Sequence, residues 1–214
     1  MYDKRMNSYL TIQGRTTAET EEKKSRFITH LCHVETEEEA LAFLEEIREL
    51  HRMARHNVYA YIIRGSNTSE RIRYSDDGEP QKTAGLPTLD TLKHAGLSDV
   101  IAVTTRYFGG TLLGTGGLVR AYTQTAQKAI QEATLVTISQ CIDISIQLPY
   151  SLYDQTSRAL EDFGAKIIDT AYTDSVEITC RILDGTQDKL LAKLNELFRG
   201  ENNVRLSDPF DAVF

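Results

Sequence analysis

Five of the chain's 13 glycines lie close together, between residues 109 and 117. The cluster follows an apolar run at residues 99–105 and precedes a segment with helical spacing at residues 117–133. Glycine loses more conformational freedom on folding than other residues, so such a cluster predicts positive φ angles or a close approach of backbone to another group. The chain should therefore place a buried strand, a tight glycine-rich connection and a helix in succession here.

The segments before this cluster alternate between strand-like and helix-like patterns. Thr36 and Glu39 form a capping-box pattern at the start of one helix, and Gly65 lies in a turn between two strands. The expected elements are a strand at 26–34, a helix from 36 to about 54, paired strands at 58–64 and 71–74, and a helix containing Leu86, Leu89 and Leu92. The boundary of this mixed domain is expected near residues 135–140.

The last third of the chain has the clearest pattern. Residues 141–148 (CIDISIQL) alternate apolar and polar side chains, which is typical of a strand with one buried face. A helix at 151–163 ending before Gly164, a hairpin at 166–172 and 175–183, a helix at 188–198 and a strand from 204 follow. This βαββαβ order predicts a ferredoxin-like domain. The fold class is therefore α+β, with domains at 1–136 and 137–214.

Composition narrows the class of protein. The formal net charge is −7, which argues against a protein that coats nucleic acid without selectivity. Residues 1–138 carry 17 Lys and Arg against 18 Asp and Glu, whereas the remaining residues carry 7 against 13. The three scattered cysteines contain no CxxC pair and are expected in the core. Without a signal-peptide pattern or a membrane-length apolar run, the sequence predicts a cytoplasmic protein.

The glycine cluster is flanked by groups that suit an anionic partner. Bare backbone N–H groups at a helix N-terminus can bind phosphate, and aromatic rings can stack on bases. The candidate residues are Arg106, Tyr107, Phe108, Gly109, Gly110, Gly114, Gly116, Gly117 and Arg120. The P-loop and dinucleotide fingerprints both fail, because Thr115 stands where a P-loop has lysine and Val119 where the third glycine belongs. A tight structural connection and an anion-facing loop remain equally open.

A second unusual stretch is the acidic loop at residues 75–85. Asp76, Asp77 and Glu79 lie within four positions, where like charges repel unless a partner compensates them. The simpler interpretation is a solvated loop whose acids favour the next helix N-terminus. The alternative is a Mg²⁺ site, since this ion prefers carboxylate oxygens.

These two stretches resemble the signature segments of the IMPACT/YigZ family. The segments are SDDGEPQKTAG at 75–85 and VTTRYFGGTLLGTGGLVRAY at 103–122, supported by KSRF at 24–27 and RHNVYA at 55–60. The chain departs from the family pattern at Gln81-Lys82, where a small residue followed by glycine is expected. The resemblance implies a first domain with the fold shared by domain IV of elongation factor G, a ribosomal small-subunit protein and the GHMP kinases. It also implies a second domain similar to the ferredoxin-like domains of elongation factor G.

The resemblance further implies regulation of translation, as in the eukaryotic family members. The main hypothesis is a non-catalytic protein that binds RNA, the ribosome or a translation-related partner, with no cofactor. It predicts that Tyr107 and Phe108 share one face with seven basic residues, Lys24, Arg26, Arg55, His56, Lys82, Arg106 and Arg120. The alternative is a Mg²⁺-dependent phosphoryl-transfer or hydrolytic enzyme using the glycine-rich loop. A third hypothesis is a protein-facing regulator whose acidic second domain docks a basic protein.

Overall fold

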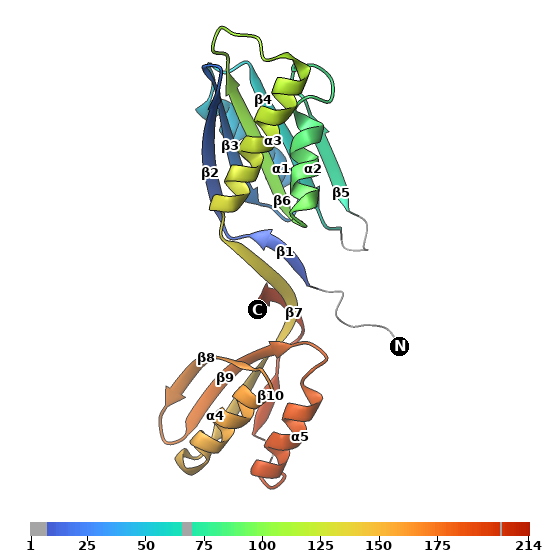
Figure 1. Cartoon of the computed structure of the whole chain (residues 1–214). Helices are drawn as coiled ribbons and strands as arrows, with labels where there is room; N and C mark the ends of the chain where they lie inside the picture. The colour runs from blue at the N-terminus through green and yellow to red at the C-terminus, as the bar shows by residue number, and fades with distance from the viewer. Residues whose placement is uncertain (1–7, 66–69, 202) are drawn as a thin grey trace. The chain divides into compact units, whose positions relative to one another are not determined.

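The computed structural model describes residues 8–65, 70–201 and 203–214. The chain divides into two compact units, Tyr9–Val136 and Thr137–Phe214, the second of which also includes Ser8. Both units combine helices with a β-sheet, which confirms the α+β fold class (Figure 1).

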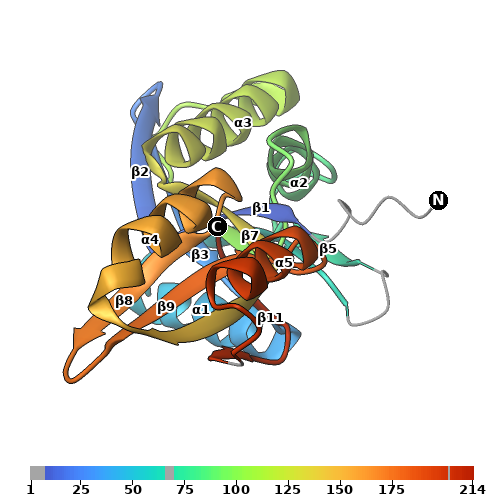
Figure 2. The same ribbon diagram turned by 90° about the horizontal axis from the view of Figure 1, so that it is seen from below.

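The first unit is built on a five-stranded antiparallel sheet in the order β2-β3-β6-β4-β5. The strands are β2 (Arg15–Glu22), β3 (Ser25–His33), β4 (His56–Ile63), β5 (Arg71–Ser75) and β6 (Val100–Tyr107), and the short strand β1 (Tyr9–Ile12) precedes them. Helix α1 (Glu37–Leu50) covers one face, and α2 (Gly85–His94) and α3 (Gly114–Glu132) cover the other (Figure 2). The central strands are therefore buried on both sides.

The alternation of side chains along β6 explains this three-layer arrangement. Ile101 and Val103 pack with the apolar stripe of α1, whereas Val100 and Ala102 pack with α2 and α3. A strand with both faces covered is mostly apolar, and residues 100–103 are apolar and buried. The buried polar residues that follow, Thr104, Thr105 and Arg106, each hydrogen-bond to another side chain. The prediction of a strand with two apolar faces is confirmed.

The sequence did not indicate the edge strand β2. Its residues, RTTAETEE, are mostly exposed and include only one fully buried side chain, Ala18. An edge strand with one solvated face has little apolar periodicity, so the pattern that reveals central strands is missing. Helix α3 also begins at Gly114, three residues earlier than the sequence predicted.

The second unit has the predicted βαββαβ order. Strand β7 (Leu135–Leu148) pairs with β9 (Val176–Leu183), which pairs with β8 (Lys166–Tyr172), and β10 (Val204–Leu206) lies on the other side of β7. Helices α4 (Tyr153–Asp162) and α5 (Asp188–Leu197) cover the apolar face of this sheet, and a 3₁₀ turn, η2 (Tyr150–Leu152), precedes α4. The additional strand β11 (Phe210–Val213) also pairs with β7.

Several local predictions are confirmed by backbone geometry. Thr36 caps α1 by accepting a hydrogen bond from the Glu39 backbone N–H at 3.1 Å. The Glu39 carboxylate bonds the N–H of Glu35 rather than that of Thr36, so the second half of the capping box is shifted by one residue. Gly164 adopts φ +73° directly after α4, as a helix-terminating glycine should.

The cysteines behave as core residues. Cys141 and Cys180 are buried and Cys32 is half-buried, and none forms a disulfide. Burial raises the pKa of the Cys180 thiol to about 12, with a smaller contribution from Asp143. Within the described residues, no helix is both long and apolar enough to cross a membrane.

Candidate nucleic-acid interface

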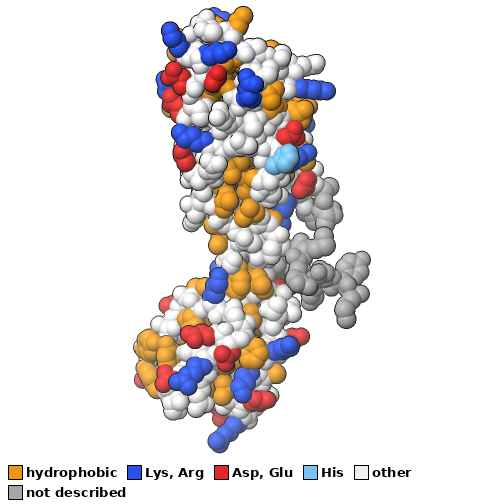
Figure 3. All heavy atoms as spheres, in the orientation of Figure 1, with side chains coloured by type: hydrophobic (Ala, Val, Ile, Leu, Met, Phe, Trp, Pro, Cys, Tyr) orange, Lys and Arg blue, Asp and Glu red, His pale blue; other side chains and the backbone are white. Residues whose placement is uncertain are grey.

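The predicted site residues lie at one end of the first unit. At this end strands β3 and β4 begin, strands β5 and β6 finish, and helices α2 and α3 start (top of the view in Figure 1). The register places Arg106 beside Phe27 on β3 and beside His56 on β4. We call this region the basic end, defined by residues 22–26, 52–56, 76–85 and 106–120. Figure 3 shows Lys and Arg side chains around it, with acidic side chains on one side.

Arg106 is not available for binding, contrary to the prediction. It is 7% exposed, and its guanidinium donates to the Glu79 carboxylate at 2.7 and 3.0 Å. Tyr122 donates to the same carboxylate at 2.8 Å. Burial, followed by the charge of Glu79, raises the pKa of the Tyr122 phenol far above its usual range. The three side chains form a buried hydrogen-bonded cluster that connects the acidic loop to β6 and α3. We call it the Arg106–Glu79–Tyr122 cluster.

The Arg106 guanidinium also lies beside two aromatic rings. Its guanidinium carbon lies 5.5 Å from the centroid of the Phe27 ring and 5.6 Å from that of Phe108. Its Nε is buried without a hydrogen-bond partner in the described structure. Phe108 itself is 57% exposed, so its outer face is open to a partner. Arg106 is therefore a buried residue that lies against Phe108 and supports its ring.

The carboxylates of the acidic loop are engaged inside the protein. Asp76 accepts hydrogen bonds from the backbone N–H groups of Lys82, Ala84 and Gly85 at 2.8–3.0 Å. This carboxylate thus caps the N-terminus of α2, where its charge complements the helix dipole. The capping role matches the simpler interpretation drawn from the sequence.

The other two acids of the loop also have protein partners. Asp77 accepts a hydrogen bond from the Asn57 backbone N–H at 2.6 Å and lies 3.5 Å from the Arg48 guanidinium. Glu79 belongs to the buried Arg106–Glu79–Tyr122 cluster. Asp76, Asp77 and Glu79 therefore face three separate sets of donors. Among the described residues no group of three or more His, Cys, Asp or Glu side chains could hold a metal ion. The magnesium interpretation, and the enzyme alternative built on it, gain no support from this geometry.

The glycines of the cluster serve different purposes. A Cβ on Gly109 would lie 2.0 Å from the backbone carbon of Lys24, so this glycine is required for the close approach of two backbones. Gly110 and Gly114 adopt φ angles of +85° and +71°, which L side chains rarely adopt. Gly117 lies against Leu113, whose Cβ would be 3.1 Å from a Cβ added at this glycine. Gly116 has open space around it and no positive φ angle.

The N-terminus of α3 differs from that of α2. The N-cap residue of α3, Leu113, makes no side-chain capping hydrogen bond, and the first turn of the helix contains no acidic residue. Residues 114–116 (Gly-Thr-Gly) are exposed, so small side chains leave the backbone N–H groups of this turn accessible. Exposed N–H groups at the positive end of a helix dipole suit an anion. The structural interpretation of the cluster therefore applies at Gly109, whereas the anion-facing loop at residues 114–116 stays a prediction.

Four of the predicted cationic side chains are free in the described structure. Lys24, Arg55, Lys82 and Arg120 are exposed, and their side chains have no hydrogen-bonding or ion-pair partner there. Arg120 lines a groove that Glu22 also lines, but the two do not form an ion pair. Two further exposed cations that the sequence did not single out lie nearby, Lys23 and Arg52. Lys23 precedes the strand predicted at 26–34, and Arg52 lies in the last turn of the helix predicted to end near residue 54, so neither position gave a signal of a site.

Two other predicted cations have internal partners. Arg26 makes a bidentate pair with Glu19 at 2.8 and 2.9 Å, and its guanidinium carbon lies 5.8 Å from the Tyr107 ring centroid. His56 bonds through Nδ1 to the Asp77 carbonyl oxygen at 2.8 Å. An exposed pair such as Arg26–Glu19 can exchange partners at little cost. Arg26 can therefore contribute to a surface, whereas His56 mainly fixes the acidic loop.

Tyr107 belongs to a chain of hydrogen-bonded side chains. Its hydroxyl lies 2.9 Å from His51 Nδ1, His51 Nε2 lies 2.9 Å from His30 Nε2, and His30 Nδ1 lies 2.9 Å from the Thr17 hydroxyl. Burial, and then the neighbouring His51, lowers the pKa of His30 to about 4. Burial, and then Arg26, also lowers the pKa of His51. Both imidazoles are therefore neutral near pH 7, and they hold the Tyr107 ring beside Arg26.

Lys82 lies at the departure from the family pattern. It adopts φ +62°, a left-handed conformation that favours glycine. A glycine is what the resemblance predicts at this position. Lys82 is therefore an exposed cation at a position where glycine would cause less backbone strain.

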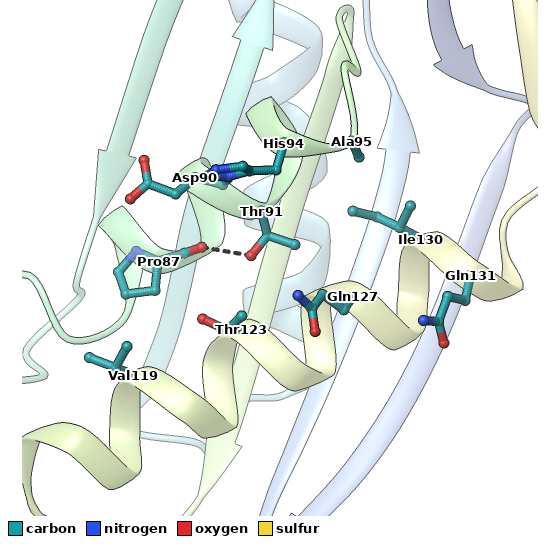
Figure 4. Close-up of a pocket in the computed structure, with 10 residues that line it drawn as sticks. All are labelled: Pro87, Asp90, Thr91, His94, Ala95, Val119, Thr123, Gln127, Ile130 and Gln131. Atoms are coloured by element: carbon teal, nitrogen blue, oxygen red, sulfur yellow. Dashed lines mark hydrogen bonds between the residues drawn. The ribbon is translucent and has the colours of Figure 1, made fainter.

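A groove of the first unit reaches the basic end at Val119. It runs between α2 and α3, with a volume of about 730 Å³, and is shown in Figure 4. Pro87 and Val119 lie near one end of it, and His94 and Ile130 lie toward the other. Thr91 points toward α3 but donates its hydroxyl hydrogen to the Pro87 carbonyl at 2.8 Å. Among the described residues that line the groove, Asp90 and His94 are the ionisable ones.

These features define a two-domain α+β protein with a cation-rich, glycine-containing end on its first unit. Residues 23–130 match the Impact N-terminal domain, and residues 146–201 match a domain of unknown function (DUF1949). The chain belongs to the IMPACT family.

Full-length relatives support this assignment. The chain is 36% identical over 195 residues to "IMPACT family member YigZ" of Escherichia coli (strain K12), covering 91% of this chain and 96% of that protein. It is 32% identical over 200 residues to "IMPACT family member YvyE" of Bacillus subtilis (strain 168), covering 94% and 91%. A solved structure titled "Crystal structure of an hypothetical protein" is 36% identical, with a TM-score of 0.61, and covers 94% of this chain and 97% of that one.

Proposed function

We propose that this protein is a non-catalytic regulator of translation or of a stress response, and that its basic end binds RNA, free or within the ribosome. One observation carries the proposal. Lys24, Arg55, Lys82 and Arg120 are exposed without carboxylate partners in the described structure, while the three acids of the loop, Asp76, Asp77 and Glu79, are satisfied by internal donors. Glu22 is the one exposed acid among the described residues of the basic end. The local surface is thus more positive than the composition of the first unit suggests.

The remaining features of the basic end suit a nucleic acid. The uncapped α3 N-terminus offers backbone N–H groups to a phosphate, and the exposed Phe108 offers a ring face to a base. Phosphate contacts supply most of the affinity in such complexes, and stacking adds about 1–3 kcal/mol per base. The buried Arg106–Glu79–Tyr122 cluster holds the acidic loop, the end of β6 and α3 in a fixed arrangement.

A salt series tests the proposal directly. Binding of a fluorescently labelled single-stranded RNA of about 20 nucleotides is measured by anisotropy between about 50 and 200 mM salt. The tested variant carries Lys24→Gln, Arg55→Gln, Lys82→Gln and Arg120→Gln. We expect its affinity to fall at least about tenfold and the slope of log K against log[salt] to decrease by about three, since each lost phosphate contact removes about 0.7.

The matched control changes net charge equally but elsewhere. It carries Lys93→Gln, Arg158→Gln, Lys189→Gln and Arg205→Gln, four exposed cations outside the basic end. Its affinity should stay within about threefold of the unmodified protein. Absence of RNA binding at low salt, or an equal loss in both variants, would overturn the proposal.

A further inference from the structure

The second unit exposes a cluster of tyrosines on its surface. Tyr150 and Tyr172 stack with ring centroids 6.4 Å apart, and the Tyr172 centroid lies 6.0 Å from that of Tyr153. Tyr153 packs against the apolar core of the unit, whereas Tyr150 and Tyr172 are 53% and 59% exposed. We call these three residues the tyrosine cluster. Its inner ring covers the core, and its two outer rings are open to a partner.

The rings of the tyrosine cluster are held in place by their hydroxyl groups. Tyr150 donates to the Thr173 carbonyl at 2.7 Å, and Tyr172 donates to the Tyr153 hydroxyl oxygen at 3.2 Å. Tyr150 follows Pro149 in the short turn η2, which limits the freedom of the backbone there. Rigid aromatic side chains lose little entropy on binding, which is why tyrosine is common at the energetic centres of interfaces.

The acidic charge of the second unit indicates the charge of a partner that the tyrosine cluster could bind. Residues 139–214 contain 7 Lys and Arg against 13 Asp and Glu. Asp154 follows Tyr153 in the first turn of α4, and Asp174 lies in the turn after Tyr172. Both are exposed, and neither pairs with a cation within the described structure. Such a surface repels phosphate and attracts Lys and Arg side chains.

We propose that the tyrosine cluster is a docking surface for a basic peptide segment of a partner protein, with Arg side chains stacked on Tyr150 and Tyr172 and balanced by Asp154 and Asp174. Arginine suits this surface because its planar guanidinium stacks on aromatic faces while keeping its charge. The proposal is independent of RNA binding, since it concerns a different unit and a partner of opposite charge.

The experiment uses the full chain and peptides of defined chemistry. Fluorescein-labelled (Arg-Gly-Gly)₃ is compared by anisotropy with the Lys, Gln and Asp versions of the same peptide and with a single-stranded RNA. We expect the Arg peptide to bind most tightly, the Lys peptide several-fold more weakly, and the Gln and Asp peptides negligibly. Equal binding of the Arg and Gln peptides would overturn the proposal.

Substitutions locate the binding. Tyr172→Ala and Tyr150→Ala should each weaken binding of the Arg peptide by about threefold to fivefold, whereas Tyr172→Phe, which keeps the ring face, should bind nearly normally. Tyr150 lies outside the core, so Tyr150→Ala remains informative even if Tyr172→Ala perturbs folding. The control Tyr74→Ala removes a 40% exposed tyrosine of the first unit and should have no effect.

A charge test separates stacking from electrostatics. Asp154→Asn with Asp174→Asn should weaken binding of the Arg peptide and flatten its salt dependence, whereas Asp162→Asn with Asp208→Asn, two other exposed acids of the same unit, should not. Loss in both double variants, equal loss on Tyr74→Ala, or RNA binding that depends on Tyr150 and Tyr172 would each contradict the assignment.

Discussion

The guanidinium of Arg106 lies 2.7 Å from Glu79 Oε1, and side-chain exposures of 8% and 3% make this a buried ion pair. It connects the end of β6 to a loop residue that precedes it by 27 positions, and Tyr122 of α3 completes the contact. The basic end is therefore organised around an arginine that faces inward. The predicted cations that remain exposed without a partner in the described structure lie in the surrounding turns, except for Arg120, which lies on α3.

Breaking this pair should destabilise the first unit strongly. Glu79→Gln leaves the Arg106 charge buried without a counter-ion, so we expect a loss of about 3–5 kcal/mol in the free energy of unfolding. The double variant Glu79→Gln with Arg106→Met should lose less than the sum of the two single changes, because no charge is then left uncompensated. Urea denaturation measures both. Single variants within about 1 kcal/mol of the parent would show that the pair is not buried as described.

The glycine cluster offers a matched pair of substitutions. Gly109→Ala places a methyl group 2.0 Å from the Lys24 backbone and should destabilise the protein by about 3 kcal/mol or prevent folding. Gly116→Ala, in the same cluster but with nothing within 4 Å, should be neutral or stabilising by up to about 1 kcal/mol. Thermal denaturation distinguishes them. Equal effects at the two positions would contradict the assigned role of Gly109.

Replacing Lys82 should change stability and RNA binding in opposite directions. Because its φ angle is +62°, Lys82→Gly should raise the free energy of unfolding by about 1 kcal/mol while removing one exposed cation. RNA affinity should fall by a few-fold in the same variant. Lys93→Gly, in the last turn of α2, serves as the control and should lower stability without affecting RNA binding. A Lys82→Gly protein that is both less stable and unchanged in binding would count against both assignments.

The histidine pair predicts a pH dependence of stability. His30 has a folded pKa of about 4, below its unfolded value of about 6.5, so the unfolded chain binds the extra proton between these pH values. Stability should be fully present above about pH 6.5 and decline as pH falls toward 4, by on the order of 1–2 kcal/mol after allowance for partial solvation. His30→Gln should flatten this decline in urea titrations. The control His94→Gln, on an exposed helix end, should not.

The sequence determined most of the secondary structure of this protein. Period-two alternation at 141–148 and the apolar run at 99–105 predicted β7 and β6, because burial of one or both strand faces fixes which positions are apolar. Gly164 and Thr36 marked helix ends by local backbone chemistry that does not depend on distant residues. The edge strand β2 was missed, since a solvated strand need not be apolar.

The tertiary structure alone decided which predicted site residues are exposed. Arg106 and Arg120 look alike in sequence, yet one is buried against Glu79 and the other is exposed. Asp76, equally, caps a helix that begins nine residues later at Gly85. Local spacing cannot reveal such pairings, because a charged side chain is satisfied by whichever segment the folded sheet and helices bring within hydrogen-bonding distance.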